Sequence, residues 1–456
     1  MQISVARAIA YEALRRVEAE GAYATDVLHA DLAAKVKPQD AALATEITLG
    51  VLRWRRLLDF LLDRSLKKPV AKLDLPVAIA LRMGLFQLCF LDRVPAAAAV
   101  NESVELVKRA RKASAATLVN AVLRRATKEP NERVERLLPA DLSQAERLAV
   151  LHSHPTWMVE RWLARLGTAA TEALLAANNK TPQLSCAING IDHRDEVLSS
   201  LTKAGLRVFP GKLLKNAIAV SGGSPARSDA FHKGWMSIQD EASQIVPLLL
   251  EVRPGDRVLD VCAAPGGKTP TLVRAAGRMG MVVAADRHAH RLRAMRTQFE
   301  RLGLGNVPVV ELDATKSLPF GTEFDRILVD APCSGTGTLA RHPEIRWRLK
   351  PEQLQEFHAL QMQMLKQALA QLARGGRLVY STCSTEPEEN DEVVAEVLAV
   401  CPRTRRVTAE EMTRGLSQHL VAGVEADTLF GRLGHFRTIP GAQNCDGFFA
   451  VAIEKE

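Results

Sequence analysis

From about residue 237 onward the chain repeats one pattern, a short apolar run followed by a turn and then, in most cases, a helical segment. The apolar runs and their turns read DRVLDVCAAP, MVVAADRH, VPVVELDAT, FDRILVDAPCSG and GRLVYSTCS. Strands that alternate with helices form a parallel sheet with helices on both faces. Such a sheet binds its ligands beyond the carboxyl ends of its strands. The pattern therefore predicts an α/β domain and the edge at which its site lies.

Acidic residues stand at the ends of successive predicted strands. Asp286 ends the second strand, 26 residues after Asp260, and Asp313 ends the third. An acid at the end of the second strand of such a sheet accepts hydrogen bonds from ribose hydroxyls, and the third strand end is where an adenine ring would lie. Any one of these acids would more often be a helix cap or a turn residue. Three at successive strand ends favour a ligand with a ribose and an adenine.

The turn after the first strand, CAAPGGKT, nearly matches a triphosphate-binding loop. That loop needs G-x-x-x-x-G-K-[ST], but its first glycine falls on Cys262, and Pro265 removes an N–H that would face a phosphate. The G-x-G-x-x-G of nicotinamide enzymes is also missing from this turn. S-adenosylmethionine fits best, because it has a ribose and an adenine but no phosphate. An ATPase stays as the alternative, with RILVDAP as its second motif.

The cysteines point away from disulfides and zinc. The chain has 7 Cys, scattered and without a C-x-x-C pair, which favours a reducing cytoplasm. Cys333 and Cys383 both lie in polar turns at the ligand edge of the predicted sheet. A thiolate beside a methyl donor suits methylation of cytosine, because its addition to carbon 6 makes carbon 5 nucleophilic, once the base is unstacked. Spacing alone does not say which cysteine attacks.

Upstream of residue 237 the pattern is different. Residues 1–140 show only helical periodicity and predict a helical bundle. Residues 141–236 mix strand and helix patterns and predict a small α+β module, which precedes the α/β domain of residues 237–456. Neither a signal peptide nor a membrane span is expected.

Positive charge is concentrated in the first third of the chain. The net charge is +8, and residues 1–140 hold 23 Lys and Arg against 16 Asp and Glu. Two clusters stand out there, one around Trp54 (Arg53, Arg55 and Arg56) and one in residues 108–112. An anionic partner such as nucleic acid and a merely solvated surface both account for this excess.

The motifs together resemble those of a known family. DVCAAPGGKT, DAPCSGTG, RHPEIRW, YSTCS, EPEENDEVV and DGFF resemble the motif set of the Sun/Nop2 family of RNA 5-methylcytosine methyltransferases, and SIQDEASQ resembles the start of its catalytic domain. The helical first 140 residues, with NAVLRR, resemble the antitermination factor NusB. The resemblance implies a multidomain chain: a NusB-like helical RNA-binding domain (1–140), a small α+β linker and RNA-binding module (141–236) and a Rossmann-like methyltransferase domain with a mostly parallel sheet (237–456).

The family also implies roles for the strand-end residues. The methionine and ribose part of S-adenosylmethionine would contact Cys262, Ala263, Ala264, Pro265, Gly266, Gly267 and Lys268. Asp286 would bind the ribose hydroxyls, Asp313 would lie near the adenine, and Asp330 would lie close to both the methyl donor and the base. Cys383 would be the nucleophile, and Cys333 would assist product release. No metal is implied.

The remaining implications concern substrate and partners. The two resemblances together imply methylation of carbon 5 of a cytosine in 16S ribosomal RNA, in the cytoplasm. Free rRNA and an early small-subunit particle are both compatible with them, and neither a membrane nor an obligate protein partner is expected. One alternative is that the chain methylates another RNA, such as tRNA. A second is that it is a non-catalytic RNA-binding protein. Lys268 would orient the base or stabilise charge, and Arg341 would contact RNA or brace the site.

Overall fold

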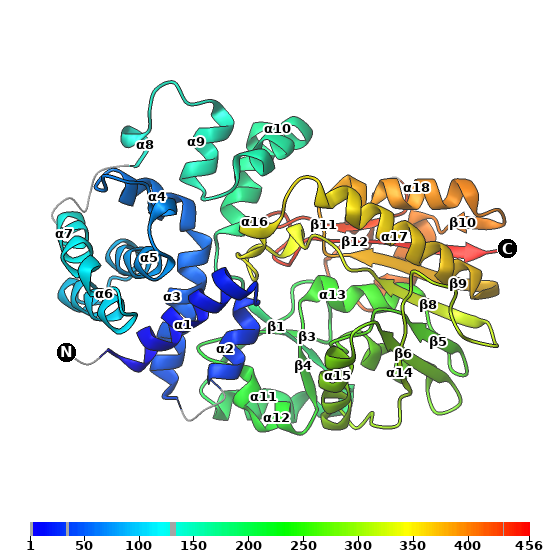
Figure 1. The fold of residues 1–456 in the computed structure, drawn as a ribbon. Coiled ribbons are helices and arrows are strands. Elements are labelled where there is room, and N and C mark those ends of the chain that lie inside the picture. Colours follow the sequence, from blue (N-terminus) through cyan, green and yellow to red (C-terminus); the bar gives the residue numbers. More distant parts are fainter. Residues whose placement is uncertain (1–2, 33–35, 128–133, 432) are drawn as a thin grey trace. The chain divides into compact units, whose positions relative to one another are not determined.

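In the computed structural model, which describes residues 3–32, 36–127, 134–431 and 433–456, the chain divides into two units. The first consists of residues 1–181 together with 339–348, and the second of residues 182–338 and 349–456. The second unit holds the strands of the chain and the first is helical (Figure 1). The three-part division at residues 140 and 236 stays a prediction.

The first unit is built around one buried helix. Its helices are α1 (Val5–Glu20), α2 (Ala24–Leu32), α3 (Pro38–Arg53), α4 (Arg55–Asp63), α5 (Leu75–Phe90), α6 (Ala96–Arg109), α7 (Ala116–Ala126), α8 (Val134–Leu137), α9 (Gln144–Leu151), α10 (Thr156–Asn178) and α16 (Ile345–Arg348). Helix α5 is buried continuously from Val77 to Gln87 and contacts α1, α3, α4, α6 and α7. A helix that is apolar on all sides is stable only when other helices surround it. The predicted helical bundle is thereby confirmed.

A charged residue lies within that buried helix. Arg82 pairs with Asp59 at 2.7 Å and with Glu18 at 3.0 Å, and only 3% of its side chain is exposed. Glu18 also pairs with Arg55 at 3.5 Å, so two guanidinium groups balance two carboxylates in this cluster. Arg82 also interrupts PVAIALRMGLFQLCFLD, the most apolar stretch of the sequence, which supplies most of this core helix.

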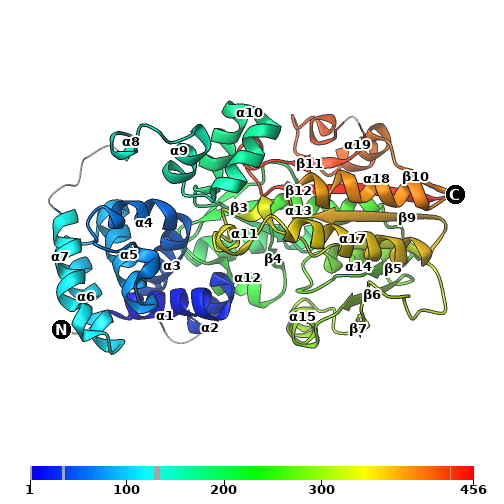
Figure 2. The ribbon, with the colours of Figure 1, turned by 45° about the horizontal axis from the view of Figure 1, so that its top comes forward.

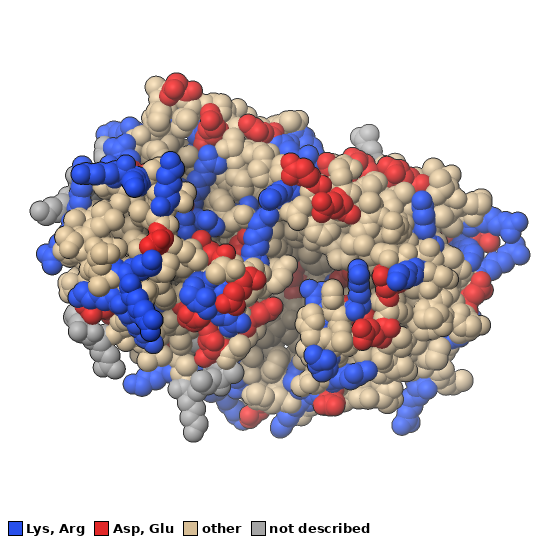
Figure 3. Space-filling view, in the orientation of Figure 1, with Lys and Arg blue, Asp and Glu red and all other residues tan. Residues whose placement is uncertain are grey.

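The two basic clusters have different environments. Lys108, Arg109 and Arg111 are exposed at the end of α6, and Figure 3 shows Lys and Arg side chains gathered over α6 and α7. Arg53, by contrast, is buried and donates to the carbonyl of Ala340 at 2.9 Å. The cluster around Trp54 therefore works inside the unit, at least through Arg53, whereas the cluster at the end of α6 is exposed.

The second unit begins with a small antiparallel sheet. Its strands are β1 (Leu184–Ile188), β2 (Arg207–Pro210), β3 (Ala217–Ser221) and β4 (Met236–Ile238), in the order β2-β3-β1-β4. Helices α11 (Arg194–Lys203) and α12 (Asp229–His232) accompany them. Cys186 lies in the core of this module, completely buried beside Val197 and Leu201. The predicted small α+β module is confirmed, although β2 and β4 carry no clear apolar pattern and were not anticipated.

The larger sheet of this unit has eight strands. They are β5 (Arg257–Asp260), β6 (Met281–Asp286), β7 (Val309–Glu311), β8 (Phe324–Asp330), β9 (Leu372–Thr382), β10 (Thr404–Arg406), β11 (Phe436–Thr438) and β12 (Phe448–Lys455). The order is β10-β12-β9-β8-β5-β6-β7, with β11 paired to β12. Strands β5 to β9 are parallel, as predicted, and β12 joins β9 in the antiparallel direction. The chain proceeds from β5 toward one edge and returns to β8 on the other side, so a topological switch point lies between β5 and β8.

Alternate residues of these strands supply two separate cores. The helices around the sheet are α13 (Glu241–Ile245), α14 (Thr269–Ala276), α15 (Ala289–Arg301), α17 (Gln353–Ala370), α18 (Asp391–Val400) and α19 (Ala409–Ser417). Val258 and Leu328 face the core that includes α14 and α19, whereas Leu259 and Ile327 face the core that includes α17 and α18. Figures 1 and 2 show the helices on the two faces. Strands buried on both faces explain the nearly continuous apolar runs of the sequence.

Residues 339–348 leave the α/β part of the chain and pack within the helical unit. Arg346 is fully buried there and donates to the carbonyls of Ser153 at 3.0 Å and Asn178 at 3.1 Å, and to Asn179 Oδ1 at 2.9 Å. Trp347 donates from Nε1 to the carbonyl of Leu52 at 2.6 Å. Burial lowers the pKa of Arg346 to about 9.

None of the described helices is long and apolar enough to span a membrane.

We expect Arg346→Ala to loosen this segment, because the carbonyls of Ser153 and Asn178 would lose a charged donor. The free energy of unfolding of the helical unit should fall by about 3 kcal/mol. Amide hydrogen exchange of residues 339–348, followed by mass spectrometry, should become faster. Lys350→Ala removes an exposed cation nearby and is the control. Unchanged exchange in Arg346→Ala would contradict the anchoring role.

Candidate active site

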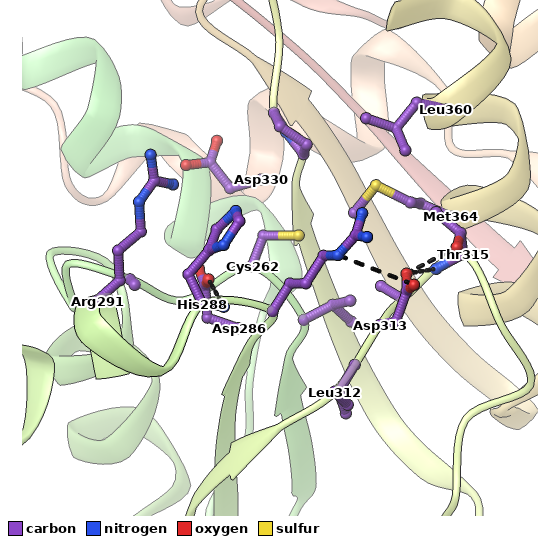
Figure 4. A pocket seen from close by; sticks show the side chains of 15 residues that line it. Cys262, Asp286, His288, Arg291, Leu312, Asp313, Thr315, Asp330, Leu360 and Met364 are labelled. Carbon is purple, nitrogen blue, oxygen red and sulfur yellow. Dashed lines mark hydrogen bonds and ion pairs between the residues drawn. The ribbon is translucent and has the colours of Figure 1, made fainter. Parts of the chain in front are cut away.

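A cavity of about 270 Å³ opens at the carboxyl edge of the parallel sheet (Figure 4). It is lined by Val261, Cys262, Ala264, Asp286, Arg287, His288, Arg291, Leu312, Asp313, Ala314, Thr315, Asp330, Pro332, Leu360 and Met364. These residues follow the ends of β5, β6, β7 and β8, or project from α17. The cavity therefore lies at the switch point of the sheet, where the strand pattern places a ligand.

The loop after β5 forms one wall. Ala263 N–H donates to the carbonyl of Ala285 at 2.8 Å, which ties the loop to the end of β6, and the Ala264–Pro265 peptide is cis. Gly266 has a φ of 95°, and a Cβ there would lie 2.9 Å from the side chains of Met295 and Phe299 on α15. Only glycine combines that φ with so close an approach. Cys262 and Ala264 line the cavity, whereas Ala263, Pro265, Gly266, Gly267 and Lys268 are not among its lining residues.

Two of the predicted strand-end acids lie at the cavity. Asp286 is 6% exposed and accepts a hydrogen bond from His288 N–H at 3.0 Å. Asp313 accepts from Thr315 N–H at 3.1 Å and from its hydroxyl at 2.7 Å, and these bonds lower the pKa of Asp313. Each acid thus shapes its own turn and also lines the cavity, and its contact with a ribose or an adenine stays a prediction.

Asp260, the first acid of the series, is not among the residues that line the cavity. It is 1% exposed and accepts from the hydroxyl of Thr269 at 2.8 Å, and burial raises its pKa to about 7. Its Oδ1 has no hydrogen-bond partner among the described residues. Asp260 therefore holds the start of α14 against the strand and is not a lining residue.

Asp330 is held from two sides at the end of β8. Lys268 Nζ lies 2.5 Å from Asp330 Oδ2, and the hydroxyl of Ser381 donates to Asp330 Oδ1 at 2.7 Å. Lys268 Nζ also lies 5.3 Å from the ring centre of Phe448. The ion pair makes Lys268 a partner of Asp330, which explains why a lysine ends the loop after β5.

The two strand-end cysteines come together. Cys333 Sγ and Cys383 Sγ are 3.4 Å apart, within hydrogen-bond distance, although 50 residues separate them in sequence. The hydrogen bond to Cys383 and burial raise the pKa of the Cys333 thiol well above its usual range. Burial, with the charge of Asp286 next in size, does the same for Cys262. Cys333 and Cys262 are therefore protonated thiols at neutral pH.

Several lining residues were not anticipated from the sequence. Arg287, His288 and Arg291 follow the end of β6, and Arg287 Nε lies 3.9 Å from Asp313 Oδ2. Leu360 and Met364 come from the middle of α17, where they follow the ordinary apolar spacing of a helix. Arg287 and His288 directly follow the predicted strand end at Asp286, so the sequence could have placed them at the ligand edge. Leu360 and Met364 lie within a helix and carry no such signal.

In the described part of the chain, His, Cys, Asp and Glu side chains form no group of three or more that could hold a metal. Arg341 lies in the segment that packs with the helical unit. Its role in RNA binding or in bracing the site stays a prediction.

Three family models match the chain in succession. Residues 4–128 match the NusB family, residues 154–227 match the ferredoxin-like domain of RsmF/B-like methyltransferases, and residues 247–454 match the family described as 16S rRNA methyltransferase RsmB/F. The fold and these matches together define a ribosomal RNA methyltransferase with an appended NusB-like domain.

Individual relatives agree with this class. Ribosomal RNA small subunit methyltransferase B of Pseudomonas putida is 38% identical over 378 residues, which are 82% of this chain and 84% of that protein. The probable enzyme of the same name from Bacillus subtilis is 32% identical over 100% of both chains. A solved methyltransferase homologue from Pyrococcus horikoshii is 28% identical, with a TM-score of 0.57 over 69% of this chain and 100% of its own. The chain belongs to the ribosomal RNA small subunit methyltransferase B family.

We expect Cys262 and Cys333 to react slowly with iodoacetamide, because only a thiolate is alkylated and both pKa values are raised. At pH 8 their rates should be at least about tenfold below that of the glutathione thiol, and each rate should keep rising with pH beyond pH 9. Peptide mass spectrometry of the labelled protein, with glutathione in the same solution as reference, gives the rates. Labelling of either thiol at the rate of glutathione would show that its surroundings do not suppress ionisation.

Proposed function

We propose that this chain methylates carbon 5 of a cytosine in 16S ribosomal RNA with S-adenosylmethionine as the methyl donor. The observation that carries the proposal is the 3.4 Å contact between Cys333 and Cys383, next to Asp330 and a cavity lined by Asp286 and Asp313. A rRNA methyltransferase that modified a ribose or an exocyclic nitrogen would have no use for two sulfurs at that place.

The cavity fits the proposed cofactor in its chemistry. Asp286 offers carboxylate oxygens to ribose hydroxyls, and Leu312, Leu360 and Met364 offer apolar surface to an adenine. Asp313 stands beside that apolar surface, and the loop at Cys262 and Ala264 would contact the ribose and methionine part, with residues 263 and 265–268 of the same loop as its support. S-adenosylmethionine, when bound, supplies a methyl group on a positively charged sulfur.

Cys383 is the proposed nucleophile. Its thiolate adds to carbon 6 of the unstacked cytosine, and the electron pair gained by the ring lets carbon 5 bond to the methyl group. The bond between that methyl group and the donor sulfur would break, and the sulfur would leave as a neutral thioether. A base then removes the proton from carbon 5, the bond between carbon 6 and sulfur breaks, and the thiolate of Cys383 is restored. In this proposal Asp330, which is fixed by Lys268 and Ser381, holds the cytosine edge.

Cys333 is suited to the release step. Because its pKa is raised, it keeps its proton and can donate a hydrogen bond to the sulfur 3.4 Å away. A donor aimed at the sulfur stabilises negative charge as the thiolate leaves. Cys333 therefore favours breakdown of the adduct without forming a bond to the base.

The other parts of the chain serve RNA binding in this proposal. The NusB-like domain (residues 1–140) would contact RNA phosphates through the exposed cluster on α6 and α7, and residues 141–236 would add a second contact. The enzyme would act in the cytoplasm on free rRNA or an early small-subunit particle. The names of the relatives and of the matching family favour small-subunit ribosomal RNA, the 16S rRNA, over tRNA.

We expect opposite outcomes for the two cysteines. Cys383→Ser should reduce methyl transfer below detection while S-adenosylmethionine binds with near-normal affinity, because serine is a far weaker nucleophile at carbon 6. Cys333→Ala should accumulate a covalent RNA–protein adduct, visible as a band of reduced mobility in a denaturing gel. An adduct that forms only in Cys383→Ser would reverse the roles, and full activity of Cys383→Ser would refute the mechanism.

We expect Asp286→Ala to weaken S-adenosylmethionine binding roughly 30- to 100-fold, because the ribose would lose hydrogen bonds to a charged acceptor. Isothermal titration calorimetry measures the affinity, with Asp427→Ala, an exposed acid of the same unit, as control. ATP should produce no binding heat with the unmodified protein. Tight ATP binding would favour the phosphate-loop alternative, and unchanged affinity in Asp286→Ala would remove Asp286 from the cofactor site.

A further inference from the structure

A buried carboxylate connects the two cysteine loops. Glu389, at the end of a 3-10 turn just before α18, has no exposed surface. Its Oε1 accepts a hydrogen bond from Ser384 Oγ at 2.6 Å and another from Ser334 Oγ, and its Oε2 accepts from Ser334 N–H at 2.7 Å. Ser334 follows Cys333 and Ser384 follows Cys383 in the chain. One side chain thus bonds to the residue after each cysteine.

The loop of Cys333 is also held on its other side. Gln361 on α17 donates from Nε2 to the carbonyl of Pro332 at 2.9 Å and to Glu389 Oε2 at 3.1 Å. Cys333 therefore lies between two residues that are both bonded to the same polar cluster. Its backbone position depends on Gln361 and Glu389 together.

Asn390 does the same for Cys383. Its Oδ1 accepts from Thr382 Oγ1 at 2.6 Å, and its Nδ2 donates to the carbonyl of Ser384 at 2.9 Å. Asn390 is 1% exposed. The residues before and after Cys383 are thereby fixed to Asn390, which is the neighbour of Glu389 in sequence.

Such a cluster is costly to bury. The four hydrogen bonds that Glu389 accepts come from uncharged groups of Ser334, Ser384 and Gln361. Burial raises the pKa of Glu389, and those bonds oppose the rise. An apolar side chain of similar volume would avoid this desolvation. The carboxylate at this place therefore needs a reason other than stability, and the two loops that it joins supply one.

We propose that Glu389 and Asn390 are positioning residues that hold the Cys333 and Cys383 loops against each other. We call these two residues and their hydrogen bonds to the two loops the clamp. The inference rests on the proposed function, because it gives both sulfurs a role in one reaction. Each residue acts through the serines and threonine beside the cysteines and does not contact the base. Loss of the clamp lets the two sulfurs separate, which slows attack on carbon 6 and release of the product.

Glu389→Gln tests the clamp with little change in shape. One carboxylate oxygen becomes an NH₂ group, so a hydrogen-bond acceptor that faces a serine donor is replaced by another donor. We expect kcat for methyl transfer to fall about 100-fold, as a displaced catalytic group does, while KM for S-adenosylmethionine and the thermal unfolding midpoint change little. Glu392→Gln alters an exposed carboxyl on the first turn of α18 and should leave kcat unchanged.

Ser384→Ala is the second variant and guards against misfolding of Glu389→Gln. It removes one hydroxyl from the cluster and should lower kcat about tenfold. Combined with Glu389→Gln, it should add much less than that factor, because both changes break the same bond. In the Cys333→Ala background, Glu389→Gln should slow formation of the RNA adduct, which isolates the effect on Cys383.

A kcat within twofold of the unmodified protein in folded Glu389→Gln would overturn the proposal. Multiplicative effects of Ser384→Ala and Glu389→Gln would also overturn it, as would a parallel loss of cofactor affinity, which indicates general disruption. Cys383→Ser in the same assay separates the two levels of inference. If it stays active, the proposed function fails; if it is inactive while Glu389→Gln is fully active, only the clamp fails.

Discussion

The parallel pairing of β8 with β9 is the constraint on which the site depends. Its register sets Asp330 opposite Ser381, and the side chains of these two residues are hydrogen-bonded at 2.7 Å. Cys333 follows Asp330 by three residues and Cys383 follows Ser381 by two. Backbone hydrogen bonds between neighbouring strands therefore decide that two distant sulfurs meet. A slip of one residue in this register would turn Asp330 to the other face of the sheet.

Strand ends were predictable from the sequence because parallel strands buried on both faces leave unmistakable apolar runs. That pattern alone predicts Asp286, Asp313 and Asp330 at one edge of the sheet, and all three line the cavity. The helix residues Leu360 and Met364 were not predictable as cavity residues, since apolar side chains at helical spacing serve a core equally well. The three-residue strands β10 and β11 were missed for a related reason, because so short a strand has no pattern of its own, whereas β12 has an apolar run but no helix after it to mark it as part of the repeat.

Polar residues inside the fold were the hardest to interpret. Glu389 and Asn390 stand in an acidic stretch that looks like a solvated helix start, and only the tertiary structure shows them to be buried. Arg53 similarly belongs to a cluster that could have faced an anionic partner or solvent, yet it donates to a backbone carbonyl within the helical unit, and Arg346 does the same. Charge in a sequence indicates a partner, but whether that partner is a nucleic acid or the chain itself depends on packing.

The path of the chain through residues 339–348 has a practical consequence. The polypeptide passes between the two units at residues 181–182, again at 338–339 and again at 348–349. The second and third passages enclose the residues that contribute Arg346 and Trp347 to the helical unit. The helical unit, which contains the NusB-like part, is therefore not one continuous stretch of the chain. A chimaera that exchanges the helical unit between relatives must therefore exchange residues 339–348 as well. Otherwise the carbonyls that accept from Arg346 and Trp347 lose their matched donors, and the ten-residue segment packs against a surface from another protein.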